Sequence, residues 1–331
     1  MELPLVSICC TAYNHEKYIA EAIEGFINQK TEFKFEILIH DDASTDKTAN
    51  IIREYEKKYP DLIKPLYQKE NQYSKKIPVT STYLYPNAKG KYIALCEGDD
   101  YWIDPYKLRK QISYMEKHSE CTFCFTNSKI IDERGKNKDK VFIPYEKENE
   151  RYYSNSNEIY NLGKLALLGF IPTATFVFPK SILKDLPAFF NKRYSAGDIK
   201  LKLYAASKGY AYFINDITSV YRANVAGSAM TKWRNYSRGQ LINHNQGYID
   251  LIDTIDEYTN YKYNNDLDKL KINFEFAKLS AMSDKEIYNN ERYKDILKDF
   301  KIIEKVKKVC VIYFPKLTNL VKRYIKKIFD L

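Results

Sequence analysis

Three short apolar segments, each followed at once by polar residues, constrain the fold of this chain more than any other feature. They cover residues 5–10, 35–40 and 91–96. Short, nearly continuous apolar runs of this kind are typical of strands buried on both faces of a parallel sheet. Segments with helical spacing of apolar residues alternate with them at 16–29, 48–59 and 105–118. This order predicts an α/β fold with a mostly parallel central sheet flanked by helices.

The rest of the chain continues this pattern and then becomes helical. Further strands are predicted at 63–68, 122–132, 171–178 and 210–221, and a further helix at 195–208. Residues 133–160 are charged and rich in Tyr and Asn, which indicates a long surface insertion. From about Trp233 onward Gly and Pro nearly vanish and helical spacing dominates. We therefore expect one domain over residues 1–230 and a helical C-terminal region over residues 231–331.

Polar turns follow the three apolar segments, at residues 11–14, 41–46 and 97–100. In parallel α/β sheets ligands bind outside the carboxyl ends of the strands, so we expect the three turns to face one crevice. Glu97, Asp99 and Asp100 place three carboxylates within four residues, and a divalent cation such as Mg²⁺ or Mn²⁺ would relieve their mutual repulsion. A solvated acidic turn is the alternative interpretation.

Two further residues have both a structural and a functional interpretation. Asp42 suits the N-cap of the following helix, and it equally suits a carboxylate that accepts the N–H of a pyrimidine base. Arg222 lies near the end of a predicted strand, where it fits either a phosphate-binding role or a structural one. The residues alone leave these alternatives open.

Several segments together resemble glycosyltransferase family 2. They are residues 6–14, 36–46 and 90–102 and the dipeptide Gly197-Asp198, and they occur in the family's order over residues 4–230. The resemblance implies a GT-A-type fold and an inverting transferase that uses a nucleotide-sugar and a divalent metal. It further implies an acceptor that is a glycan or a lipid-linked oligosaccharide in bacterial surface polysaccharide synthesis.

The resemblance also implies a role for each matching residue. Nucleotide-sugar binding falls to Thr11, Tyr13, Asn14, Asp42 and Asp99. Among them, Thr11 and Tyr13 would line the base and Asp42 would bond to it, which favours UDP, although dTDP stays open. Asp99 would approach the ribose or the sugar. Asp100 would hold the metal, Mn²⁺ or Mg²⁺, and Asp198 would be the catalytic base.

In the implied mechanism, Asp198 removes the proton from an acceptor hydroxyl group as that group attacks the anomeric carbon. The metal acts as a Lewis acid at the departing nucleoside diphosphate, and a single displacement inverts the anomeric centre. The chain departs from the family pattern at Asn224, where a His that can join the metal shell is frequent. The third metal ligand therefore stays open.

Positive charge concentrates at the C-terminal end of the chain. The formal net charge is +10, and residues 301–331 hold nine basic and two acidic residues, so they carry seven of the ten net charges. Apolar residues interleave with these lysines, which fits an amphipathic segment on an anionic membrane surface or, equally, a helix packed on the body. No recognised motif for nucleic acid accompanies the charge, so nucleic acid is not an expected partner.

Cysteine and histidine patterns add no further site. The six cysteines lie mostly within apolar runs, and the four histidines, His15 among them, have no partners at metal or triad spacing. No signal peptide is evident, and no apolar stretch reaches about 20 residues. We expect a cytoplasmic protein, peripheral on the inner face of the membrane.

Two other functions compete with the transferase hypothesis. A nucleotidyltransferase would also use metal-bound carboxylates, but it would normally carry a Gly-rich loop after the first strand, and residues 11–14 lack one. A catalytically silent glycan-binding module with the same fold is the second alternative. The joint presence of Asp42, Asp99, Asp100 and Asp198 argues against this module.

Overall fold

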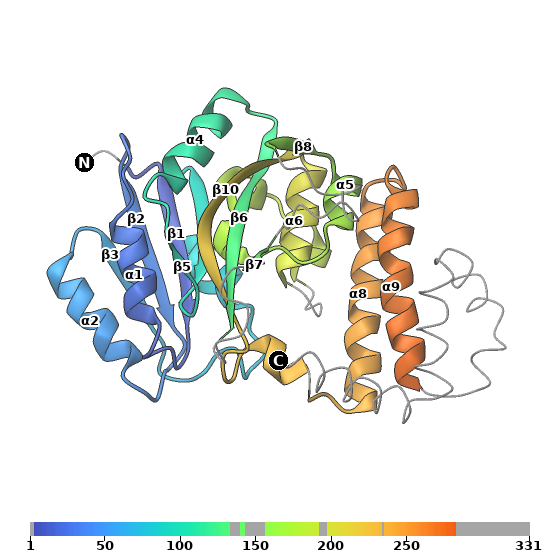
Figure 1. Cartoon of the computed structure of the whole chain (residues 1–331), viewed down its shortest axis with the longest axis horizontal. Helices are drawn as coiled ribbons and strands as arrows, with labels where there is room; N and C mark the ends of the chain where they lie inside the picture. Colours follow the sequence, from blue (N-terminus) through green and yellow to red (C-terminus); the bar gives the residue numbers. More distant parts are fainter. Residues whose placement is uncertain (1–2, 133–139, 143–155, 192–196, 234, 283–331) are drawn as a thin grey trace.

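The computed structural model describes residues 3–132, 140–142, 156–191, 197–233 and 235–282 (Figure 1). The first half comprises β1 (Val6–Ala12), α1 (Ile19–Ile27), β2 (Phe35–Asp41), α2 (Thr48–Lys58), β3 (Ile63–Tyr67), a π-helical turn (Thr80–Leu84), α3 (Tyr85–Asn87), β4 (Tyr92–Glu97), β5 (Tyr101–Trp102) and α4 (Lys107–Lys117). The second half comprises β6 (Cys121–Asp132), β7 (Lys140–Val141), β8 (Glu158–Tyr160), α5 (Leu162–Leu167), a 3₁₀ turn (Thr173–Thr175), β9 (Val177–Pro179), two more 3₁₀ turns (Lys180–Leu183 and Ala188–Asn191), α6 (Gly197–Ser207), β10 (Tyr210–Ala223), α7 (Ala229–Trp233), α8 (Arg238–Tyr258) and α9 (Asn264–Met282).

The strands form one mixed sheet in the order β3-β2-β1-β4-β9-β6-β10-β5. The first four strands in this order are parallel to one another, and β6 and β10 form a second long parallel pair. Between these two blocks β9 runs antiparallel to both β4 and β6. The predicted α/β architecture is confirmed, with the parallel part of the sheet divided into two blocks.

The prediction of a strand over 171–178 is wrong for most of its length. A 3₁₀ turn occupies Thr173–Thr175, and only Val177–Pro179 is a strand. The turn forms because both the N–H and the hydroxyl group of Thr175 donate to the carbonyl of Pro172, at 3.0 and 2.7 Å. Strand β5 was not predicted, since two residues are too few to show a period. It pairs antiparallel with Ser219 and Val220 of β10.

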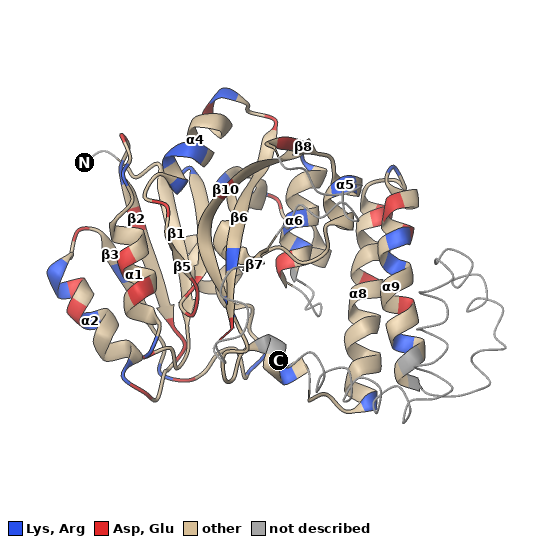
Figure 2. Cartoon of the chain, viewed as in Figure 1, with Lys and Arg blue, Asp and Glu red and all other residues tan. Residues whose placement is uncertain are grey.

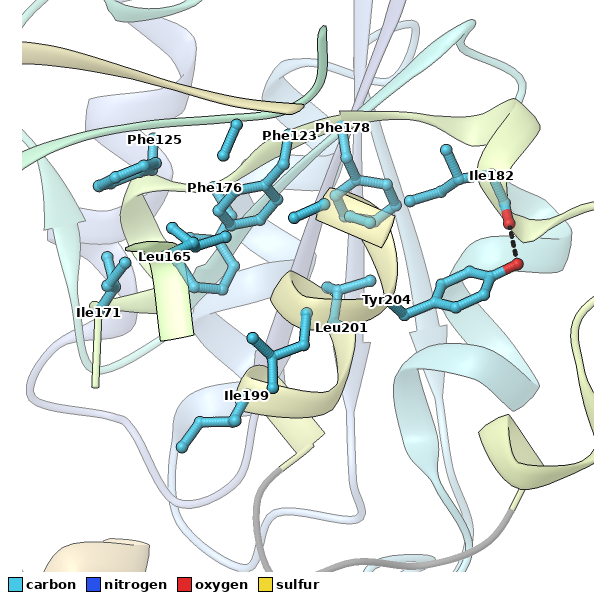
Figure 3. Close-up of a cluster of buried hydrophobic side chains, with 14 of the residues drawn as sticks. Phe123, Phe125, Leu165, Ile171, Phe176, Phe178, Ile182, Ile199, Leu201 and Tyr204 are labelled. Carbon is cyan, nitrogen blue, oxygen red and sulfur yellow. Dashed lines mark hydrogen bonds between the residues drawn. The ribbon is translucent and has the colours of Figure 1, made fainter. Parts of the chain in front are cut away.

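Side chains alternate along β1 between two hydrophobic cores. Ile8 and Cys10 belong to the core that also holds buried residues of α1, α2 and α4. Cys9, between them, belongs to the core that holds residues of α5, α6, α8 and α9. Figure 3 shows part of the second core, in which the hydroxyl group of Tyr204 donates to the carbonyl of Ile182 at 3.0 Å. The sheet is therefore buried on both faces, as its apolar strands predict.

The helices α8 and α9 lie side by side and pack against the body next to α5 and α6 (Figure 1). Helix α8 begins with a capping box, in which Ser237 and Gln240 bond reciprocally. Leu251 and Leu267 of these helices are buried in the same core as α5 and α6. None of the helices in the described part of the chain combines the length and apolar character needed to cross a bilayer. The basic segment 301–331 and most of the insertion at 133–160 lie outside the described residues.

Candidate functional site

The three polar turns meet at the carboxyl end of the parallel strands, as predicted. The N–H of Gly98 donates to the carbonyl of Thr11 at 2.8 Å, and the N–H of Asp42 donates to the carbonyl of Ala12 at 2.9 Å. These bonds continue the β4–β1 and β1–β2 ladders past the last paired residues. Figure 2 shows acidic residues in red on the segment between β4 and β5 and on the first turn of α6.

Asn14 joins the turn after β1 to the turn after β2. Its backbone is left-handed, with φ of 56°, a conformation that Asn tolerates better than most residues. Its N–H donates to Ser44 Oγ at 3.0 Å, and its side-chain oxygen accepts the N–H of Thr45 at 2.8 Å. Tyr13, which precedes it, is 42% exposed. The turn is therefore fixed while the Tyr13 side chain lies open to a ligand.

Asp42 holds the segment that follows β3. Its two carboxylate oxygens accept the N–H groups of Gln72 and Tyr73, at 2.7 and 3.0 Å, and the residue is buried. The N-cap interpretation of Asp42 is wrong, because Asp46 accepts the first N–H of α2 instead, from Thr48 at 2.9 Å. Each Asp42 oxygen keeps a second acceptor position, so a bond to a base is compatible with this arrangement.

The acidic turn between β4 and β5 crowds carboxylates together in a poorly solvated place. Asp100 is 3% exposed, and burial followed by the charges of Asp99 and Glu97 raises its pKa well above the usual range. Burial and then Asp99 raise the pKa of Glu97 to about 7. Each shift reflects the unfavourable free energy of holding several negative charges close together in a poorly solvated place.

Arg222 holds this turn in place through hydrogen bonds. Its main-chain N–H donates to Asp100 Oδ1 at 2.8 Å, and its guanidinium group donates to the carbonyl of Asp99 at 2.6 Å. The guanidinium group also pairs with Glu21 of α1 and stacks over the rings of Tyr101 and Tyr18, at 4.4 and 5.0 Å from their centroids. The structure therefore favours the structural interpretation of Arg222, which ties β10, α1 and the acidic turn together.

His15 also lies at the site, although sequence reasoning assigned it no chemistry. Its Nε2 atom is 4.0 Å from Asp99 Oδ2, and its main-chain N–H donates to Thr48 Oγ1 at 2.7 Å. Burial lowers its pKa, against the opposing charge of Asp99. A Cβ atom at Gly98 would lie 2.9 Å from Ile19 Cδ1 and 3.0 Å from His15 Nδ1, so a larger residue there would have to displace these side chains. The position of His15 directly after Asn14 was the sequence signal that could have placed it at the site.

Asp198 interacts electrostatically with the acidic turn. It lies in the first turn of α6 and is half-buried, and burial raises its pKa. Its charge contributes to the raised pKa of Glu97, which shows that the two carboxylates are near each other. We refer to Glu97, Asp99, Asp100 and Asp198 as the four site carboxylates. Three come from one turn and the fourth from a helix about 100 residues later in the chain.

The arrangement suits a divalent cation with few protein ligands. Within the described residues, no group of three or more His, Cys, Asp or Glu side chains is arranged to hold a metal ion. Asn224, the position that departs from the family pattern, instead donates to Asp132 at 2.8 Å. The carboxylate of Asp100, crowded by the charges of Asp99 and Glu97, could hold Mg²⁺ or Mn²⁺, cations that commonly take one or two protein carboxylates beside phosphate oxygens and water.

Comparisons with known proteins identify the family of the chain. Residues 7–186, more than half of the chain, match the family model described as Glycosyl transferase family 2. An uncharacterized protein of Mycobacterium tuberculosis is 47% identical over 141 residues, which are 42% of this chain and 39% of the relative. The chain thus spans 39% of the length of the mycobacterial relatives that it matches.

Two further relatives have names that state a function. The Escherichia coli protein named UDP-Glc:alpha-D-GlcNAc-diphosphoundecaprenol beta-1,3-glucosyltransferase WfaP is 29% identical over 71% of this chain and 84% of its own. The putative teichuronic acid biosynthesis glycosyltransferase TuaG of Bacillus subtilis is 34% identical over 41% of this chain and 52% of its own.

Solved structures share the fold. S. aureus TarS in complex with UDP-GlcNAc superposes with a TM-score of 0.58 and 17% identity, over 92% of this chain and 78% of TarS. The mannosyltransferase PcManGT from Pyrobaculum calidifontis, in complex with GDP-Man and Mn²⁺, gives a TM-score of 0.53 and 16% identity, over 100% of this chain and 88% of that one. The predicted GT-A-type fold is thereby confirmed.

Proposed function

Because the chain belongs to glycosyltransferase family 2, we propose that it is a metal-dependent inverting glycosyltransferase that uses a nucleotide-sugar, with UDP as the favoured nucleotide. The observation that carries this proposal is the meeting of the acidic turn 97–100 with Asp198 and with the turns after β1 and β2. With a cation bound at the acidic turn, this arrangement would receive a diphosphate beside Asp198, a carboxylate whose pKa burial raises.

The donor would bind on the side of the first two strands. Tyr13 is exposed there and Thr11 is half-buried, with Asn14 fixing the turn between them and α1. Asp42 would offer its remaining acceptor positions to the base, and Asp99 would face the ribose or the sugar. These residues lie around one edge of the sheet, which is where ligands bind in parallel α/β folds.

Asp100 would hold Mn²⁺ or Mg²⁺ together with the diphosphate oxygens. When bound, the cation would stabilise the negative charge that develops on the departing nucleoside diphosphate. Arg222 keeps Asp100 in place for this role through a main-chain bond that does not depend on its side chain. The buried position of Asp100 also excludes water from one side of the site.

Asp198 would act as the base. Its carboxylate accepts the proton of an acceptor hydroxyl group while the hydroxyl oxygen forms a bond to the anomeric carbon. The bond between that carbon and the diphosphate oxygen breaks in the same step, and the electron pair leaves with the nucleotide. Burial raises the pKa of Asp198, which brings the carboxylate nearer to the proton affinity that a general base needs.

The acceptor is proposed to be a glycan or a lipid-linked oligosaccharide in surface polysaccharide synthesis. The names of WfaP and TuaG support this proposal, since one states a diphosphoundecaprenol-linked substrate and the other teichuronic acid biosynthesis. The basic segment 301–331 would then hold the enzyme at the anionic inner face of the membrane, where such acceptors are found. Under this proposal, residues 1–230 catalyse the transfer, and residues 231–331 attach the enzyme to the membrane.

Thermal stabilisation by nucleotides tests the proposal most directly. UDP with Mn²⁺ should raise the melting temperature of the wild type, because a ligand that binds the native state stabilises it by mass action. The shift should be lost in Asp100→Ala and retained in a control variant, Asp61→Ala, in which an exposed acidic residue after α2 is removed. A panel of nucleoside diphosphates that produces no shift would contradict the proposal and favour the silent binding module.

A further inference from the structure

Three aromatic side chains from separate segments meet around Tyr221, the residue before Arg222, whose main-chain N–H donates to Asp100. They are Phe142 after β7, Phe170 after α5 and Tyr221 of β10, and we refer to them as the aromatic trio. Their ring centroids are 5.3 Å apart for Phe142 and Phe170, 5.5 Å for Phe170 and Tyr221, and 6.4 Å for Phe142 and Tyr221. All three contacts are edge-to-face, which is a favourable geometry for aromatic pairs.

The aromatic trio lies on the α6 side of the sheet. Side chains alternate along a strand, so Tyr221 points to the opposite face from Arg222, whose guanidinium group reaches α1. Phe142 packs against the core that holds α5 and α6. Burial and then the charges of the four site carboxylates raise the pKa of Tyr221, so its hydroxyl group stays protonated and can donate.

These three rings are less buried than several neighbouring rings of the same core. Phe123, Phe125, Phe176 and Phe213 are completely buried in the core. The rings of the aromatic trio are each half-buried and keep part of their surface open. Ligand-binding sites typically combine apolar walls with a few convergent polar groups. Partly exposed aromatic rings near carboxylates provide both.

A pyranose ring matches this composition. One face of such a ring presents C–H groups, and its edge presents hydroxyl groups. The negatively charged faces of aromatic rings attract C–H groups, and carboxylates or a tyrosine hydroxyl group bond to the edge. Asp198 lies in the first turn of α6, whose buried residues belong to the core against which Phe142 packs.

We propose that the aromatic trio is an acceptor subsite, which binds a pyranose ring of the acceptor with one hydroxyl group directed toward Asp198. This inference rests on the proposed function and specifies the class of acceptor as a pyranoside. Phe170 supplies the apolar wall, and Tyr221 adds a hydrogen-bond donor. The subsite binds the sugar ring itself, independently of any lipid attached to it.

Ligand-observed NMR on the full chain tests this subsite in the presence of UDP and Mn²⁺. The probes are octyl glucopyranoside and octyl N-acetylglucosaminide, with octyl glycerol as a probe that has the alkyl chain but no ring. The wild type should bind at least one pyranoside more tightly than octyl glycerol. Phe170→Ala should weaken that binding about tenfold, and Tyr221→Phe should weaken it less. UDP binding should be unchanged in both variants.

A matched control is Phe189→Ala, which removes a partly buried ring that packs on Tyr204 and Tyr258, away from the carboxylates. It should leave pyranoside binding intact. Pyranoside binding that survives Phe170→Ala, or a wild type that binds UDP but neither pyranoside, would overturn the subsite. Loss of UDP binding in the conservative variant Tyr221→Phe, with an unchanged melting temperature, would also overturn it by placing the trio at the donor. A wild type that binds no nucleotide contradicts the proposed function instead.

Discussion

The main-chain N–H of Arg222 donates to Asp100 Oδ1 at 2.8 Å, across 122 residues of sequence. The same residue is 8% exposed, and its guanidinium group bonds to the carbonyl of Asp99 and pairs with Glu21 of α1. Asp100, the residue proposed to hold the metal, is therefore positioned by β10. This relationship explains how a short acidic turn with raised pKa values keeps one geometry.

Arg222→Lys should disturb that geometry without breaking the main-chain bond. Lysine cannot reproduce the planar fork that reaches both Asp99 and Glu21 or stack in the same way on Tyr101. We expect about a 10- to 100-fold loss in kcat/KM, together with a higher Mn²⁺ concentration for half-maximal activity. Arg53→Lys, on the exposed face of α2, is the control. An unchanged Mn²⁺ requirement in Arg222→Lys would contradict a positioning role.

Asp100→Asn should separate function from stability. Burial makes the charge of Asp100 unfavourable in the free protein, so the neutral amide should leave the melting temperature unchanged or raise it. The stabilisation by UDP with Mn²⁺ should fall to the level seen with UDP alone, and transfer should fall by about 10²- to 10³-fold. Calorimetry with and without metal measures the melting temperature and its increase by UDP with Mn²⁺. A destabilised variant that still responds to Mn²⁺ would contradict this assignment.

Lys202→Met should shift the pH dependence of activity. Lys202 is 1% exposed, one helical turn after Asp198, and its ammonium group donates to the carbonyls of Gly169 and, at 3.4 Å, Leu165. Its positive charge lowers the pKa of Asp198 against the larger opposing effect of burial. Without that charge the base stays protonated to higher pH, so the acidic limb of kcat/KM should move upward.

The control for this prediction lies on the same helix. Lys200 donates to the carbonyl of Phe190, whereas the lysine charge that lowers the pKa of Asp198 is that of Lys202. Lys200→Met should therefore leave the acidic limb where it is in the wild type. Equal shifts in both variants would show that the helix as a whole has moved, and would remove the electrostatic explanation.

Lys107→Met should alter how stability depends on pH. Lys107 is fully buried, donates to Gln111 at 2.7 Å, and has its pKa lowered by burial from 10.5 to about 7. Between these two pH values the unfolded chain binds a proton that the folded chain lacks, so wild-type stability from this group rises with pH. The variant should therefore gain most at pH 7 and below, with the gain shrinking toward pH 10.

Urea unfolding at pH 6, 8 and 9.5 measures this change in the free energy of unfolding. Lys117→Met, at the exposed end of the same helix, should follow the wild-type pH dependence. A constant difference between Lys107→Met and the wild type over this range would show that packing, rather than the proton, accounts for the effect.

Local spacing in the sequence determined the alternating strands and helices and the helical character of α8 and α9. It also determined that the turns at 11–14, 41–46 and 97–100 would meet, because parallel strands bring their carboxyl ends to one edge. The family resemblance selected Asp42, Asp99, Asp100 and Asp198 from the many acidic residues, and their individual roles stay predictions.

Only the tertiary structure decided which distant segments are neighbours. The insertion of β9 between the two parallel blocks, the pairing of β5 with β10 and the approach of His15 to Asp99 leave no periodic signal in the sequence. The contacts of Arg222 with the acidic turn and of Phe170 with Tyr221 are of the same kind. The physical reason is that the spacing of apolar residues within a segment reflects local structure. Strand pairing between distant segments depends instead on the packing of the whole sheet.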